Sequence, residues 1–157
     1  MANPLAVLQK ASLFRGVPAS ELEKLAALAK EENVAPGQEL FREGAPGDAL
    51  YVVVLGTVAV SKKTARGSDE EVATVGSGSY FGEMALVDDD HKRSATVAAK
   101  EPTTVHVYAR AGIEQLCERD ASFARYLYRA VARGLARRLA VTTTDAAFYR
   151  SQSRKND

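Results

Sequence analysis

The sequence predicts an α+β fold that is mainly β, with helices at the N-terminus, a compact β-roll in the middle and a long helix at the C-terminus. Apolar residues first recur at helical spacing, at Leu22, Leu25, Ala26 and Ala29. From about residue 34 to 109, short apolar runs alternate with Gly, Pro and Asp turns at roughly ten-residue spacing, which favours a sandwich or barrel over βαβ units. The helical period then returns for most of the remaining chain.

The helical N-terminus is expected over about residues 3–33. Leu13 and Phe14 indicate a short helix packed on the same core, and Pro36-Gly37 marks the turn that follows. The β-roll is expected over about residues 34–109, with a bend at Gly56 between two apolar runs. Its candidate strands are residues 39–42, two within 49–61, then 71–75, 94–99 and 104–108. A short helical turn near Glu83–Leu86 and a polar loop at 88–92 interrupt them.

The C-terminal helices are expected over about residues 111–149, as a short helix at 111–117 and a long one from about 123. An apolar stripe of near-heptad spacing runs along the long helix, at Tyr128, Val131, Leu135, Thr142 and Tyr149. Because a long helix with such a stripe usually packs on another long element, often its own copy, we expect a homodimer through this helix.

Length and composition favour one soluble domain over residues 1–157. The chain is 46% hydrophobic, enough to bury a core, and its 21 basic and 20 acidic residues give a net charge of +1. That balance argues against a dedicated nucleic-acid binder. The lone Cys117 excludes an internal disulfide, and the N-terminus lacks the apolar run of a signal peptide or membrane helix. We therefore expect a cytoplasmic protein without membrane association.

Gly82, Glu83 and Arg93 form the most informative group of residues. The arginine can neutralise a phosphate, the glycine lets backbone N–H groups approach it, and the carboxylate can accept a hydrogen bond from a ribose 2′-OH. The group therefore suits a small anion that carries a sugar hydroxyl. An isolated arginine is more often a surface residue, and Glu83 alone could be a helix-start residue favoured by the helix dipole.

Two segments resemble the cyclic nucleotide-binding domains, a family that includes bacterial catabolite activator protein and the regulatory subunits of protein kinase A. Residues 81–86, followed after the gap from Glu83 to Arg93 by residues 93–97, resemble the phosphate-binding cassette of that family. Residues 43–51 and 56–60 resemble its glycine-rich turn and the strands beside it. The resemblance covers the chain from about Leu13 to Phe148 and implies an eight-stranded, jelly-roll-like β-roll.

The resemblance also implies roles for single residues. Arg93 would pair with the cyclic phosphate, Glu83 would accept from the ribose 2′-OH, and Ser94 would add a hydroxyl to the phosphate or base. The backbone of Gly82, Glu83, Met84 and Ala85 would offer N–H groups at the start of a short helix. Thr142 from the same subunit and Thr143 from the partner subunit would meet the adenine, and Arg138 could reach Glu83. The threonines could instead be plain helix-face residues.

The ligand implied is cAMP, with cGMP left open because Ser94 stands where cGMP-selective relatives often have threonine. Two features depart from the family: Lys92 replaces a common proline, and residues 88–91 are unusually acidic. The family's bacterial activators continue into a DNA-binding domain, and we expect none in these 157 residues, because few of them follow the long helix. We therefore expect a stand-alone sensor that regulates an unknown downstream protein.

We expect no enzymatic activity, because no nucleophile, base and orienting group can be assembled. His91, His106 and Cys117 lack the register of a metal site, so no metal or other cofactor is expected. The alternative function is a ligand-independent interaction or scaffold protein that binds a partner through the basic long helix. That helix carries Arg125, Arg129, Arg133, Arg137 and Arg138.

Overall fold

The computed structural model describes residues 1–153, without the side chains of Tyr149, Gln152 and Ser153. Residues 154–157, the end of the expected domain, lie outside that description, as does the Tyr149 side chain of the apolar stripe. The helices are α1 (Pro4–Lys10), α2 (Ala19–Ala26), α3 (Arg110–Arg119) and α4 (Ala121–Ser153), with short 3₁₀ turns η1 (Ser12–Phe14) and η2 (Glu83–Leu86). The strands are β1 (Lys30–Val34), β2 (Glu39–Phe41), β3 (Ala49–Leu55), β4 (Thr57–Lys63), β5 (Asp69–Gly76), β6 (Tyr80–Phe81), β7 (Thr96–Ala99) and β8 (Thr103–Ala109).

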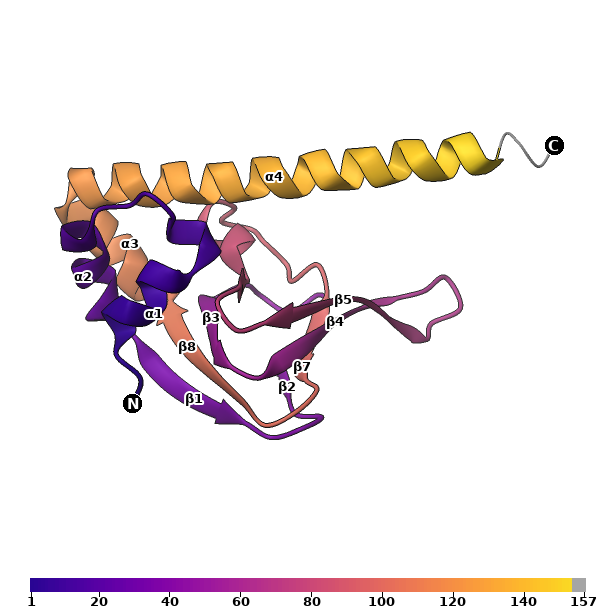
Figure 1. Cartoon of the computed structure of the whole chain (residues 1–157), viewed down its shortest axis with the longest axis horizontal. Helices are drawn as coiled ribbons and strands as arrows, with labels where there is room; N and C mark the ends of the chain where they lie inside the picture. The colour runs from indigo at the N-terminus through magenta and orange to yellow at the C-terminus, as the bar shows by residue number, and fades with distance from the viewer. Residues whose placement is uncertain (154–157) are drawn as a thin grey trace.

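The strands form two four-stranded antiparallel sheets, in the orders β1-β8-β3-β6 and β2-β7-β4-β5. They enclose one apolar core. Helices α1, α2, α3 and the start of α4 gather at one end of the roll, and α4 continues well beyond them (Figure 1). The prediction of a mainly β fold with eight strands, N-terminal helices and a long C-terminal helix is confirmed among the described residues. Gly56, with a φ of +86°, makes the expected bend between β3 and β4.

Strand β3 contributes side chains to two apolar cores, one between the two sheets and one between the roll and the helices. Its first five residues are all buried, although alternate side chains of a strand point to opposite faces. Tyr51 and Val53 pack between the sheets, whereas Leu50 and Val52 pack against the helices. The second core adds buried side chains from the helices, among them Leu8, Leu22, Leu25, Ile113, Phe123, Leu127 and Val131. The helical unit is therefore anchored to the same strand that holds the roll together.

Two strands differ from the sequence-based expectation. The helical N-terminus was expected up to residue 33, but α2 ends at Ala26 and Lys30–Val34 is strand β1. Pairing with β8, from Lys30 opposite Val107 to Val34 opposite Thr103, imposes the extended conformation on a polar segment that has no alternating pattern of its own. The two-residue strand β6 also escaped prediction, because it is specified by pairing with β3 and not by a local pattern.

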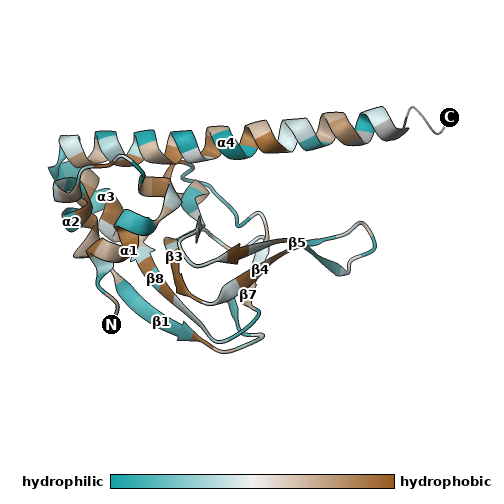
Figure 2. Ribbon diagram, viewed as in Figure 1, coloured by the Kyte–Doolittle hydropathy of each residue, from teal (hydrophilic) through white to brown (hydrophobic). Residues whose placement is uncertain are grey.

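Helix α4 has two unlike halves. Phe123, Leu127, Ala130 and Val131 are buried against the other helices. Beyond Gly134 the helix projects past the helical unit, and apolar residues continue there among polar ones (Figure 2). Leu139, Val141 and Phe148 are largely exposed in this projecting half.

Asp120 caps α4, and its charge should make folding sensitive to acid. Its Oδ1 accepts from the Phe123 N–H at 2.9 Å, and its Oδ2 lies 2.6 Å from Lys24 Nζ. Lys24 first, then that backbone N–H, lowers the pKa of Asp120 from its ordinary value of 3.8. A lowered folded-state pKa contributes stability above the unfolded value, and this contribution is lost as pH falls through the folded value.

We therefore expect Asp120→Asn to lower the Tm at pH 7, and the gap from wild type to narrow below about pH 4. Thermal unfolding followed by circular dichroism across pH 7 to 3 measures this. Asp145→Asn, on the projecting half of α4, is the control and should leave the Tm unchanged. A Tm gap that stays constant across this range would contradict the assigned role of the charge.

Candidate functional site

A pocket of about 380 Å³ opens between the second sheet, the η2 segment and α4. Its apolar wall comes from β2, β4, β5, β6 and β7, and its polar groups come from residues 82–94 and α4. Such a pocket, apolar with a few convergent polar groups, has the form and size of small-molecule sites, which span roughly 300–1,000 Å³. The polar lining residues are Glu83, His91, Arg93, Ser94 and Arg138.

Arg93 is a buried cation, only 2% exposed, held at the pocket wall. Its Nη2 donates to the Ala49 carbonyl at 2.9 Å and to Asp48 Oδ1 at 3.3 Å, and its Nη1 donates to the Gly82 carbonyl at 3.3 Å. The guanidinium carbon lies 4.1 Å from the centre of the Phe41 ring. Its Nε is buried without a hydrogen-bond partner among the described residues. An unpaired buried donor on a cation favours an anionic ligand.

Gly82 is required by both backbone conformation and space. Its φ is +82°, in the left-handed region that side chains other than glycine rarely adopt. A Cβ at this position would lie 2.8 Å from both the Ala49 carbonyl oxygen and Arg93 Nη1. Glycine therefore lets the chain turn into η2 directly beside the arginine.

Glu83 is the buried anion of the site, 1% exposed, and it pairs with Arg138 of α4. Arg138 Nη1 donates to Glu83 Oε1, and Arg138 Nη2 donates to the Tyr80 carbonyl at 3.1 Å. A buried carboxylate needs such a cation, because an unpaired buried charge is strongly destabilising. The structure thus brings Arg138 to Glu83, as expected, across 55 residues of sequence.

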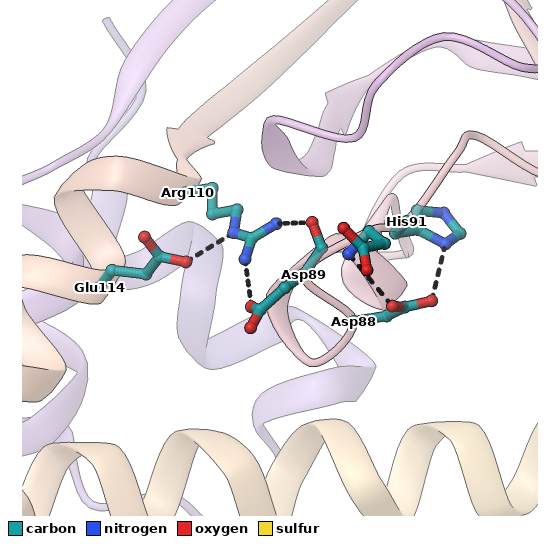
Figure 3. A network of polar contacts seen from close by, with 6 residues as sticks. Asp88, Asp89, His91, Arg110 and Glu114 are labelled. Atoms are coloured by element: carbon teal, nitrogen blue, oxygen red, sulfur yellow. Dashed lines mark hydrogen bonds and ion pairs between the residues drawn. The ribbon is translucent and has the colours of Figure 1, made fainter.

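The acidic loop at residues 88–91 is partly neutralised from outside the pocket (Figure 3). Arg110 pairs with the Asp89 carboxylate, donates to the Asp89 carbonyl at 3.2 Å and donates through Nε to Glu114 Oε1 at 2.6 Å. Glu114, the larger influence, and Asp89 raise the pKa of Arg110. His91 lies in the pocket lining with its Nδ1 3.8 Å from Asp88 Oδ2. Asp89 of the loop is thereby held against α3 through its contacts with Arg110.

The structure brings most of the predicted site residues together. Those that line the pocket are Gly82, Glu83, Met84, Arg93 and Ser94. Ala85 is fully buried behind it, and its N–H donates to the Gly82 carbonyl at 3.4 Å. Their roles toward a ligand stay predictions.

Thr142 and Thr143 lie one turn beyond Arg138, outside this pocket. Both are exposed, and their hydroxyls donate to the carbonyls of Arg138 and Leu139 at 2.9 and 2.8 Å. Thr142 borders a shallower depression together with Arg137, Arg138 and Val141. The expected contact of Thr142 with a base, and that of Thr143 from a partner subunit, stay predictions.

Two residues of the site were not singled out from the sequence. Phe41 supports the Arg93 guanidinium, and an aromatic residue just before the glycine-rich turn was the only local signal for it. Asp48 lies within that turn and contacts Arg93, but no pattern distinguishes it from an ordinary turn aspartate.

Metal sites and membrane-spanning helices are both missing from the described part of the chain. Residues 1–153 contain no group of three or more His, Cys, Asp or Glu side chains able to hold a metal ion. No helix among them combines the length and apolarity needed to cross a membrane.

Comparison with known proteins places this site in a family. Residues 31–120 match the family model described as cyclic nucleotide-binding domain. The chain is 37% identical over 109 residues to the cAMP-dependent protein kinase regulatory subunit of Yarrowia lipolytica, covering 69% of this chain and 28% of that protein. It is 27% identical over 131 residues to the CRP-like cAMP-activated global transcriptional regulator of Mycobacterium tuberculosis, covering 83% of this chain and 58% of that one.

A solved structure shares the fold. The crystal structure of a cyclic nucleotide-binding domain from Methylobacillus flagellatus matches with a TM-score of 0.78 and 26% identity, over 91% of this chain and 80% of that one. The family model covers more than half of the 157 residues and includes every residue of the pocket lining except Arg138 of α4. This chain belongs to the cyclic nucleotide-binding domain family.

Proposed function

We propose that this protein is a cyclic nucleotide sensor whose ligand is cAMP and which regulates a separate partner protein. The observation that carries the proposal is the buried Arg93, whose Nε has no partner among the described residues, in the wall of a pocket. A cyclic phosphate supplies the anion that this donor lacks. The protein acts by binding and not by catalysis, and no metal or other cofactor takes part.

Each polar group of the pocket has a place in this proposal. Arg93 and the Ser94 hydroxyl bind the cyclic phosphate, together with N–H groups of the segment from Gly82 to Ala85. Because Arg138 engages Oε1 of Glu83, Oε2 is left to accept from the ribose 2′-OH. The apolar wall, with Val60, Ala73 and Val75 from the β4–β5 hairpin, covers the purine.

Adenine selectivity and signalling both involve α4 in this proposal. Thr142, and Thr143 from the second subunit of a homodimer, contact the base through α4. Some relatives are named for cAMP and others of similar identity are named cGMP-dependent protein kinases. The choice of cAMP in this proposal therefore rests on Ser94, where cGMP-selective relatives often have threonine, and on the hydroxyls of Thr142 and Thr143. Bound nucleotide then shifts the population of α4 positions, because α4 contributes Arg138 to the pocket. We place this sensor in the cytoplasm, in keeping with a single cysteine.

Titration calorimetry with cAMP, cGMP and the non-cyclic control AMP tests the ligand. We expect cAMP to bind most tightly and AMP, which carries a doubly charged acyclic phosphate, to give no heat. Ligand at about a hundred times Kd should also stabilise the fold by about 2.7 kcal/mol in a thermal shift. Sedimentation of the same samples reports the dimer. No heat and no shift with millimolar cAMP would overturn the proposal and favour a partner-binding role for the basic helix.

A further inference from the structure

Helix α4 is in close contact with the β-roll at Gly134. A Cβ at Gly134 would overlap the Tyr80 hydroxyl and would lie 3.1 Å from Leu13 Cδ1. The helix backbone therefore rests directly against the end of the tyrosine side chain. Glycine inside a helix costs about 1 kcal/mol relative to alanine, so a glycine at this contact has a packing reason.

The same tyrosine also supports Arg138. The Arg138 guanidinium carbon lies 4.8 Å from the centre of the Tyr80 ring, and Nη2 donates to the Tyr80 carbonyl at 3.1 Å. Gly134 and Arg138 are one helical turn apart and so share a face of α4. Tyr80 thus contacts α4 twice, three residues before Glu83, the residue with which Arg138 pairs.

Tyr80 cannot easily retreat from the helix. Its side chain is part of the helical core, the residue is only 8% exposed, and its backbone pairs with Val52 of β3. Arg138, by contrast, has a side chain that is 48% exposed and depends on the helix backbone for its place. A bulkier residue at position 134 would therefore displace α4 and not the tyrosine.

We propose that Gly134 and Tyr80 are positioning residues: their contact sets the height of α4 over the pocket and thereby holds Arg138 on Glu83. The inference rests on the proposed function, since the affinity for nucleotide is what this positioning serves. Lifting α4 would carry Arg138 away from a carboxylate that is otherwise buried, and Glu83 would lose the cation that orients it toward a ribose hydroxyl.

Gly134→Ala should weaken cAMP binding by about fivefold or more in titration calorimetry. Gly112→Ala in α3 is the matched control, because a Cβ there would meet Leu28 only at ordinary contact distances of 3.6 and 3.7 Å. Both changes replace a helical glycine by alanine and raise helix propensity alike. The control should bind cAMP as wild type does. Wild-type affinity in Gly134→Ala would overturn the inference.

Removing the tyrosine hydroxyl should rescue the alanine variant. In Tyr80→Phe/Gly134→Ala the nearest ring atom would lie 3.4 Å from the new Cβ, an ordinary contact. Leu13 Cδ1, at 3.1 Å, is the end of a flexible side chain and would have to move by only a few tenths of an ångström. We expect this double variant to bind within about twofold of Tyr80→Phe alone, so the two changes are not additive. A double variant as weak as Gly134→Ala would show that the hydroxyl is not the obstacle, and would refute the proposed contact.

A readout without ligand separates this inference from the proposed function. The coupling between Glu83 and Arg138 is measured by thermal unfolding of Glu83→Gln, Arg138→Gln and the pair. We expect that coupling to fall by about half or more when the cycle is repeated in the Gly134→Ala background. If wild type binds no nucleotide, the proposed function fails, whereas an unchanged coupling refutes the positioning role on its own.

Discussion

Replacement of Arg93 by leucine will weaken cAMP binding by about 2–5 kcal/mol, roughly thirtyfold to several thousandfold. The guanidinium is buried, so a bound phosphate would meet it with little screening by water. Leucine loses the guanidinium contact with Phe41 and provides neither a hydrogen-bond donor nor a positive charge for the phosphate. Titration calorimetry of folded protein gives the change.

Two further variants and a folding check separate loss of phosphate binding from misfolding and from loss of any arginine. Leucine also removes the side-chain donor to the carbonyls of Ala49 and Gly82, so the fold must be checked by circular dichroism. Arg93→Lys keeps the charge but loses the planar set of donors, and we expect an intermediate affinity. Arg42→Leu removes an exposed arginine that pairs with Glu39 and should have no effect. A folded leucine variant that binds cAMP like wild type would show that Arg93 is not the phosphate ligand.

Glu83→Gln will weaken cAMP binding by about 1.5–3 kcal/mol, the usual worth of a hydrogen bond to a charged group, or about ten- to a hundredfold. The substitution preserves the shape of a side chain that is almost fully buried. It removes the negative charge that attracts both Arg138 and the ribose hydroxyl. The same calorimetric titration measures the loss.

The ligand 2′-deoxy-cAMP serves as the internal control for this experiment. It lacks the hydroxyl that Glu83 is proposed to accept from, so wild type should bind it more weakly than cAMP. Glu83→Gln should bind 2′-deoxy-cAMP with nearly the same affinity as wild type binds 2′-deoxy-cAMP. Equal losses for both nucleotides would mean that Glu83 acts through Arg138 or the fold and not through the ribose.

The polar centre of the site was predictable because it is local in sequence. Gly82 and Glu83 are adjacent, and Arg93 follows within a short loop, so residue types and spacing were enough to bring them together. The strands could likewise be predicted from the sequence wherever turn residues bounded an apolar run. Gly56 and the buried run of β3 are the clearest cases.

The remaining features depend on contacts between distant segments. Strand β1 is extended because β8 offers it a partner, and its own polar sequence contains no such signal. The contact between Gly134 and Tyr80 follows from the height at which α4 crosses β6, which no spacing rule predicts. Thr142 and Thr143 follow the helix outward, so within one chain they lie beyond the pocket that their sequence pattern suggested.

The length of the projecting half of α4 means that a small tilt of the helix would move its far end by a much larger distance. From Gly134 to Ser153 it extends roughly 28 Å at 1.5 Å per residue. A tilt of ~10° about Gly134 would therefore move its far end by ~5 Å, whereas Arg138, one turn from the pivot, would move by only ~1 Å. A shift of ~1 Å at Arg138, enough to weaken its ion pair with Glu83, would thus accompany a shift of ~5 Å at the far end of the helix. A partner protein bound at that end could respond to the larger shift.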